Sequence, residues 1–201
     1  MVLVLTLIAI AAGAALAYVN SVTAPQIEKI NQDNLNKGIK EVLGVAADAA
    51  INVETPDTFY MEGKEKKADN IQFIIYKTDQ GTAVSSVTNG FGGALKVLVG
   101  FDSEGTIKGY TVLAHSETPG LGAKAQQWFQ KDGKGCIIGL NLGNCNLTVS
   151  KDGGDIDAIT ASTITSRAFL TAVKNAYDKF MNGEVDAQTS ATQQEKKGGQ
   201  E

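Results

Sequence analysis

The fold is decided by residues 95–115, which read LKVLVGFDSEGTIKGYTVLAH. Apolar side chains alternate through the first half of this stretch, which ends at the turn residues 102–105. Residues 107–115 then form a second apolar run that returns from the turn. Alternation with a period of two, broken by a turn that contains glycine, is typical of a β-hairpin. We therefore expect two antiparallel strands here.

A second hairpin is expected immediately before the first. Residues 71–76 and 82–88 have the composition of strands, and Asp79-Gln80-Gly81 lies between them as a turn. The two hairpins are joined through Gly90-Phe91-Gly92-Gly93, where the missing side chains permit a bulge or a close approach of the backbone to a ligand. The charged run 62–70 is expected to form a solvated turn.

The last periodic segment is a helix. Phe169, Val173, Ala176 and Phe180 follow one another at spacings of four, three and four, which is the pattern of one helical face. The helix is expected to begin near residues 163–166 and to end at Asn182-Gly183. Together these elements predict an α+β domain, with a small antiparallel sheet and packed helices, preceded by one N-terminal transmembrane helix.

The N-terminal segment predicts a membrane anchor over residues 1–20. Residues 2–19 carry no charge, and as a helix they span about 27 Å, close to the thickness of a bilayer core. A cleaved signal segment or a buried core helix are the alternatives.

A separate stalk helix is expected over residues 21–44, with Thr23 as its cap, Pro25 in its first turn and Gly44 after its end. Residues 45–186 then form the domain, and the polar tail 187–201 is expected to be disordered.

Composition excludes some functions. The net charge is −4, and Arg167 is the only arginine, so no nucleic-acid partner is expected. Cys136 and Cys145 are too far apart for a CxxC pair, and His115 is the only histidine, so we expect no metal site. The two cysteines either close a small loop as a disulfide or remain unpaired thiols.

Residues 157–167, which read DAITASTITSR, contain five hydroxyl side chains within seven positions. They stand directly before the last helix, whose first backbone N–H groups lack partners within the helix and whose dipole is positive at that end. Such hydroxyls can cap the helix, hold a phosphate, or be esterified by one. The residues alone leave all three roles open.

Residues 116–122, which read SETPGLG, form a sharply shaped loop after a strand. Pro119 fixes φ, and Gly120 and Gly122 permit crowded or left-handed backbone. The loop is either a plain turn or a binding surface for a flat aromatic ligand.

His115 is interpreted as a structural residue at a strand end rather than a general base. Because no nucleophile elbow, Walker motif or GxGxxG is present, any reactivity is expected to come from a cofactor.

At this point the residues match a known family. Residues 157–163 resemble the flavinylation motif of FMN-binding domains, which usually reads Asp, two variable residues, Ser or Thr, Gly, Ala, and Thr or Ser. Residues 115–122 resemble the Glu-Thr-Pro-Gly-Leu-Gly loop of that family, and residues 90–93 resemble its earlier glycine patch. The anchor followed by Thr23-Ala24-Pro25 also fits. The resemblance covers residues 2 to about 183 and is greatest to the G subunits of Rnf electron-transport complexes, with the C subunits of sodium-translocating quinone reductases as near relatives.

The resemblance implies a covalent FMN. In this family a flavin transferase joins the FMN phosphate to the final hydroxyl of the motif by a phosphoester bond, and Thr163 stands at that position. Asp157 would serve in recognition by the transferase. Ala161 and Ser162 depart from the usual Gly and Ala. The residues expected to frame the flavin ring are Glu117, Thr118, Gly120, Leu121 and Gly122. Those expected to bond the phosphate are Thr160, Ser162 and Thr165.

The function implied is that of a membrane-anchored electron-transfer subunit in an ion-translocating ferredoxin:NAD⁺ oxidoreductase. It is a redox subunit without a complete active site of its own. Its partners would be other membrane subunits, the flavin transferase and the lipid bilayer. It would cross the inner (cytoplasmic) membrane once, with the domain on the extracytoplasmic side. The alternatives are a subunit of a sodium-translocating NADH:quinone reductase and an unmodified membrane-anchored scaffold domain.

Overall fold

A computed structural model describes residues 2–45, 51–54, 59–62, 65–68 and 73–182. The chain forms two compact units, residues 1–37 and 38–201, which are described separately. The expectation for the tail 187–201, and the first two residues of the expected strand 71–76, lie outside the described residues.

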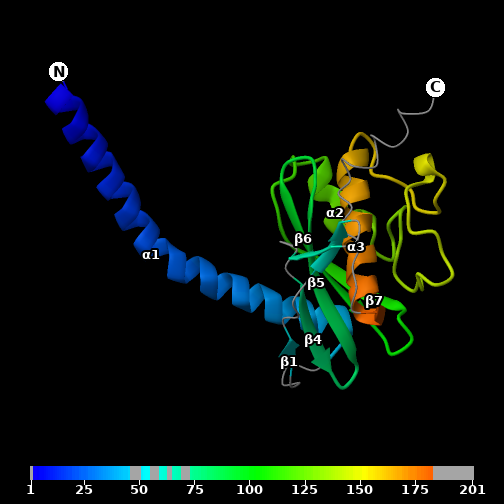
Figure 1. Ribbon diagram of the computed structural model, residues 1–201. Coiled ribbons are helices and arrows are strands. Elements are labelled where there is room, and N and C mark those ends of the chain that lie inside the picture. Colours follow the sequence, from blue (N-terminus) through cyan, green and yellow to red (C-terminus); the bar gives the residue numbers. More distant parts are fainter. Residues whose placement is uncertain (1, 46–50, 55–58, 63–64, 69–72, 183–201) are drawn as a thin grey trace. The chain divides into compact units, whose positions relative to one another are not determined.

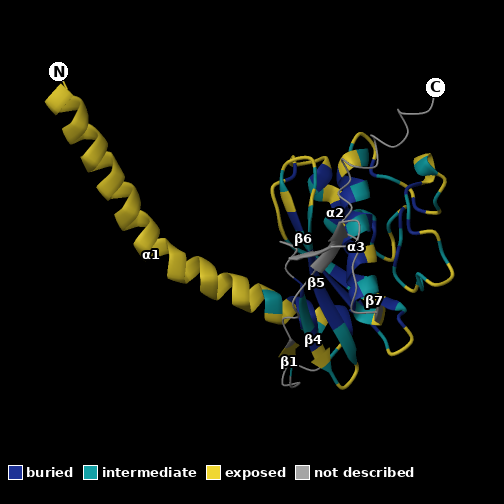
Figure 2. Cartoon of the chain, in the orientation of Figure 1, coloured by how far each residue is buried: buried dark blue, intermediate teal, exposed yellow. Residues whose placement is uncertain are grey.

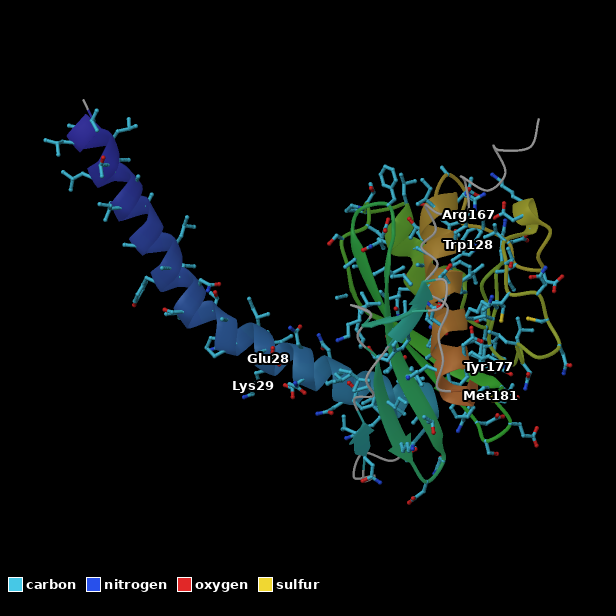
Figure 3. The ribbon with its side chains drawn as sticks, in the orientation of Figure 1. Glu28, Lys29, Trp128, Arg167, Tyr177 and Met181 are labelled. Atoms are coloured by element: carbon cyan, nitrogen blue, oxygen red, sulfur yellow. The ribbon has the colours of Figure 1, made fainter. Side chains whose placement is uncertain are left out.

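Helix α1 (Val2–Leu43) is continuous, so the prediction of a separate helix beginning at Thr23 is wrong. The Thr23 hydroxyl donates to the backbone oxygen of Val19 (2.8 Å), which places it inside a helix rather than at a cap. Pro25 lies within the helix and cannot donate the usual backbone bond. The result is a bend, visible just before Glu28 and Lys29 (Figure 3).

The first part of α1 is long and apolar enough to cross a membrane. None of the side chains in its most apolar window is buried within the protein, and Figure 2 shows this part exposed throughout. The core helix of a soluble domain is, by contrast, mostly covered by other elements.

The second unit is built on a five-stranded antiparallel sheet of order β1-β4-β5-β6-β7. Its strands are β1 (Asn52–Glu54), β4 (Ile74–Thr78), β5 (Gly81–Asn89), β6 (Ala94–Phe101) and β7 (Ile107–His115). Both predicted hairpins are confirmed: β4 pairs with β5, and β6 pairs with β7. Sequential antiparallel strands need only short connections, which is why tight turns sufficed to predict them.

A separate two-stranded sheet consists of β2 (Phe59–Glu62) and β3 (Glu65–Ala68). It corrects the prediction of a solvated turn over residues 62–70, because residues 65–68 form a strand that pairs with β2. Charged residues are depleted in strands, so composition concealed an element that backbone hydrogen bonds create.

Helix α3 (Thr163–Asn182) covers one face of the sheet and lies over β5 and β6 (Figure 1). The predicted apolar face is confirmed, since Phe169, Val173 and Ala176 are fully buried. The Phe169 ring stacks on Phe129 with a centroid separation of 4.3 Å and meets Tyr110 edge-on at 4.8 Å. These aromatic contacts form the centre of the core.

The last turn of α1, residues 38–43, belongs to the second unit and packs on the opposite face of the sheet. Glycines make room for it: a Cβ on Gly100 would overlap the Val42 side chain. The ammonium of Lys108 donates to the backbone oxygen of Leu43 (2.7 Å) and so caps the end of the helix. Gly44 follows with a φ of 68°, as the predicted stop requires.

The chain between β7 and α3 contains only short helices: η1 (Gly122–Lys124), α2 (Ala125–Trp128) and η2 (Ser150–Asp152). Cys136 and Cys145 lie in the irregular stretch between α2 and η2, and both are free thiols. Of the two alternatives raised by the sequence, the structure therefore contains the unpaired cysteines.

Candidate functional site

Three segments singled out by sequence meet at one end of the sheet. They are the glycine patch between β5 and β6 (residues 90–93), the loop after β7 (residues 116–122) and the first turn of α3 (Figure 1). The residue that joins them is Glu117, which contacts all three.

The Glu117 side chain is buried, with 4% of its surface exposed. Its Oε2 accepts a hydrogen bond from the Thr165 hydroxyl at 2.7 Å, and its Oε1 accepts one from the backbone N–H of Gly92 at 3.3 Å. A buried carboxylate is tolerated only where such donors replace water. Glu117 thus ties the loop after β7 to both α3 and the glycine patch.

Glycines enclose this carboxylate. A Cβ on Gly90 would overlap the Glu117 Oε1, and a Cβ on Gly122 would lie 2.5 Å from Oε2 and 2.8 Å from the Thr165 hydroxyl. Real Cβ atoms do not approach so closely without displacing a neighbour. These two glycines therefore leave the space that the Glu117 side chain occupies.

The loop after β7 is held by its own backbone. The N–H of Glu117 donates to Nδ1 of His115 (3.2 Å), which confirms the interpretation of His115 as a structural residue at a strand end. The N–H groups of Leu121 and Ala123 both donate to the oxygen of Thr118, and Gly120 has a φ of 76°. The loop therefore presents Thr118 and Leu121 on its outer surface, where both are exposed.

The segment before α3 forms a tight turn, in which the N–H of Ser162 donates to the oxygen of Ile159 (3.0 Å). Ala161 occupies the third position of this turn with a φ of 62°, and it is the only described non-glycine residue with a positive φ. A β-turn with positive φ at this position favours glycine. This backbone conformation explains why the family usually has Gly at the position of Ala161.

Two of the five clustered hydroxyls are used internally. The Thr165 hydroxyl donates to Glu117, so its predicted bond to a phosphate would require that contact to open. The Ser166 hydroxyl, fully buried, accepts from the Ile159 N–H and donates to the oxygen of Ser162, both at 2.9 Å. These two residues hold the turn and the loop together.

The other three hydroxyls, on Thr160, Ser162 and Thr163, have no hydrogen-bond partner among the described residues. The same holds for the backbone N–H groups of residues 163–165, at the start of α3. Within the described chain, then, no hydroxyl of the cluster caps this helix. Donors that converge at the positive end of a helix, with no protein acceptor, are what a phosphate requires.

Asp157 lies at the start of the same segment with its carboxylate exposed. The indole N–H of Trp128 donates to its backbone oxygen (2.8 Å), and the Ser150 hydroxyl donates to its Oδ1 (3.3 Å). Arg167, which is labelled in Figure 3, forms a bidentate pair with Asp152, with bonds of 2.7 and 2.9 Å. That pair raises the pKa of the Arg167 guanidinium.

Sequence reasoning missed Trp128, Ser150 and Asp152 as supports of this segment. Trp128 and Arg167 are the single tryptophan and the single arginine of the chain, and that rarity was the available signal. Their contacts join residues 7 to 29 positions apart through irregular chain, so no periodicity indicated them.

Each of the three converging segments also exposes one large apolar side chain. Phe91 is 69% exposed, Leu121 is 40% exposed and Ile164 is 42% exposed. Exposed apolar side chains on segments that also carry open polar donors are typical of a site for a ligand with both an apolar and a charged part.

The segments that form the site lie in a region of the sequence that is shared with known proteins. A family described as the FMN-binding domain matches residues 90–178, a range that contains all the site residues predicted from sequence. The chain is 33% identical over 186 residues to the G subunit of the Na⁺-translocating ferredoxin:NAD⁺ oxidoreductase complex of Acetobacterium woodii, covering 90% of each chain. It is 32% identical over 200 residues to the G subunit of the ion-translocating oxidoreductase complex of Aliivibrio fischeri, covering 93% of this chain and 92% of the relative. The corresponding Escherichia coli protein is 37% identical over 117 residues, which cover 55% of this chain and 56% of the relative.

Proposed function

The chain belongs to the family of G subunits of ion-translocating oxidoreductase complexes and contains an FMN-binding domain, and we propose that it carries its FMN as a phosphoester on Thr163. It is a membrane-anchored redox subunit of an ion-translocating ferredoxin:NAD⁺ oxidoreductase complex. When bound, FMN supplies the one- and two-electron chemistry that the side chains of this chain lack.

The open N-terminus of α3 carries the proposal. Three backbone N–H groups, of residues 163–165, and three hydroxyls, of Thr160, Ser162 and Thr163, are without acceptors there among the described residues. They can supply hydrogen bonds and a favourable dipole to a phosphate ester. Thr163 is the first residue of the helix, so an ester on its oxygen keeps the phosphate beside these donors.

The flavin ring is proposed to lie over the loop that Glu117 organises. Thr118, Gly120 and Leu121 are exposed on this loop, and Gly122 lies against Glu117 beneath it. Phe91 and Ile164 offer apolar surface from the two neighbouring segments. A planar ring with a polar edge suits apolar side chains and backbone without Cβ atoms.

Covalent attachment would hold the cofactor at high effective concentration where free FMN would diffuse away. We propose that the domain, residues 45–186, lies on the extracytoplasmic side of the inner membrane. Residues 1–20 would form the lipid anchor, and residues 21–44 would form the stalk. The apolar exposed surface of α1 supports contact with lipid and with other membrane subunits.

Maturation would require a flavin transferase, and Asp157 is proposed as one of its recognition residues. Its carboxylate is exposed, and its backbone is fixed by Trp128. A group recognised by an enzyme has to be both accessible and held in one place.

The test is covalent flavin fluorescence after denaturing electrophoresis of the full-length protein, produced together with a flavin transferase. We expect a fluorescent band in the native protein and in the control Thr171→Val, a half-buried threonine two turns along α3. We expect none in Thr163→Val. Fluorescence that persists in Thr163→Val and disappears in Ser162→Ala would move the attachment to Ser162. A native protein without covalent flavin would instead support the unmodified scaffold.

A further inference from the structure

Ser166 takes part in three hydrogen bonds within residues 159–166, the segment that contains the proposed attachment residue Thr163. Its hydroxyl accepts the N–H of Ile159 and donates to the oxygen of Ser162, each at 2.9 Å. Its own backbone N–H donates to the same Ser162 oxygen at 3.0 Å. The N–H of Ser162 in turn donates to the oxygen of Ile159. These four bonds close a ring that contains residues 159–166.

The ring fixes a peptide group that matters for phosphate. The Ser162 oxygen belongs to the same peptide plane as the N–H of Thr163, and in a trans peptide the two point in opposite directions. Since Ser166 holds that oxygen toward α3 with two bonds, the Thr163 N–H is directed away from the helix. That N–H is one of the three backbone donors left open at this end.

The four bonds satisfy the backbone groups of Ile159 and Ser162 but not the hydroxyls of Ser162 and Thr163. The Ile159 N–H and oxygen and the Ser162 N–H and oxygen all have partners inside the ring, whereas the hydroxyls of Ser162 and Thr163 have none among the described residues. Ser166 itself is fully buried, so its hydroxyl is not available to a transferase or to a flavin.

From these contacts we propose that Ser166 is a positioning residue for the attachment of FMN to Thr163. It acts through the Ser162–Thr163 peptide group, which it orients so that the Thr163 N–H and hydroxyl face the incoming phosphate together. The proposal rests on the proposed attachment at Thr163.

The reaction it assists can be written in balance. A bond forms between Oγ of Thr163 and the FMN phosphorus of a flavin dinucleotide, and the anhydride bond of that donor breaks. The nucleotide monophosphate leaves, and the Thr163 hydroxyl proton passes to a base of the transferase. No electrons are transferred. A donor group fixed before this step lowers its barrier because it needs no reorganisation.

The experiment compares single-turnover rates of covalent flavin formation on the full-length protein in detergent, with purified flavin transferase and saturating flavin adenine dinucleotide. Ser166→Ala removes the bridging hydroxyl, and Ser166→Thr retains it. Ser85→Ala is the matched control, because Ser85 is equally buried and its hydroxyl has no hydrogen-bond partner among the described residues. The fluorescence of Trp128 and circular dichroism establish that each variant is folded.

We expect Ser166→Ala to slow the step by about tenfold to a hundredfold, Ser166→Thr to restore most of the rate, and Ser85→Ala to match the native protein. If Ser166→Ala does not fold, Ser166→Cys takes its place, since a thiol fills the space but bonds weakly, and the same slowing is expected. A native rate in Ser166→Ala or in Ser166→Cys overturns the positioning role of Ser166. The proposed attachment at Thr163 is then unaffected. Absence of covalent flavin in the native protein overturns the attachment itself, and the role of Ser166 with it.

Discussion

Replacing Ala161 by glycine is expected to stabilise the folded domain. Ala161 has a φ of 62°, and left-handed backbone costs a residue with a Cβ roughly 1–2 kcal/mol. Glycine gains freedom in the unfolded chain, which offsets about 0.4–1 kcal/mol. The Ala161 side chain is exposed, so its removal loses no buried contact. The expected net gain is about 0.5–1 kcal/mol in the free energy of unfolding.

The measurement is urea unfolding of the full-length protein in detergent, followed by the fluorescence of Trp128. This single tryptophan suits the purpose because its indole N–H bonds the backbone of Asp157, at the start of the same segment. With a urea dependence of about 2 kcal/mol per molar, the midpoint should rise by about 0.3–0.5 M.

Ala114→Gly is the matched control, since Ala114 is also exposed but lies in the extended strand β7. There the same substitution is expected to destabilise by about 0.5–1 kcal/mol. The two variants should therefore shift the midpoint in opposite directions. Equal destabilisation by both would refute the left-handed turn at Ala161 and the explanation of why the family usually has glycine at this place.

Further predictions concern the buried carboxylate and the core. Gly122→Ala should lower the free energy of unfolding, measured in urea, by about 1–3 kcal/mol, because its Cβ would lie 2.5 Å from Oε2 of Glu117 and break the hydrogen bond of that carboxylate. The control is Gly120→Ala, which has open space around it and a φ of 76° and should lower the same free energy by only about 1 kcal/mol. Thr165→Val removes the 2.7 Å donor to Glu117 and should cost about 1–3 kcal/mol by the same assay; a loss below a few tenths would show that the contact is not formed. Burial raises the pKa of the Tyr110 phenol, which donates to the oxygen of Ala125, so its contribution to stability is complete below the unfolded pKa of about 10 and is lost as pH rises further. Alkaline unfolding should therefore begin above about pH 10, and Tyr110→Phe should weaken that pH dependence.

Local patterns predicted the parts of the fold that local interactions form. The hairpins β4–β5 and β6–β7 were evident from alternation and turns, and α3 from its apolar spacing. Strand β1 has three residues and β3 is mostly charged, so neither has a pattern of its own. Pro25 indicated a helix start, but a proline bends a long helix without ending it when the neighbouring turns persist.

At the site, the sequence identified the segments but not which of their residues form internal hydrogen bonds and which remain exposed. The glycines at 90 and 122 suggest room for a ligand, whereas they first admit the side chain of Glu117. Thr165 and Ser166 look like their neighbours in the hydroxyl cluster, yet both are buried and used internally. The Thr165–Glu117 contact spans 48 residues, and only the tertiary fold creates it.

The central claim is that Thr163 carries the flavin, and peptide mapping by tandem mass spectrometry tests it most directly. Protein isolated from membranes that contain the flavin transferase would be digested, and the peptide that spans residues 152–167 would be fragmented. We predict one added FMN phosphoryl group per chain, with every fragment that contains Thr163 carrying the added mass. A peptide without that mass, or an added mass confined to fragments that lack Thr163, would contradict the account.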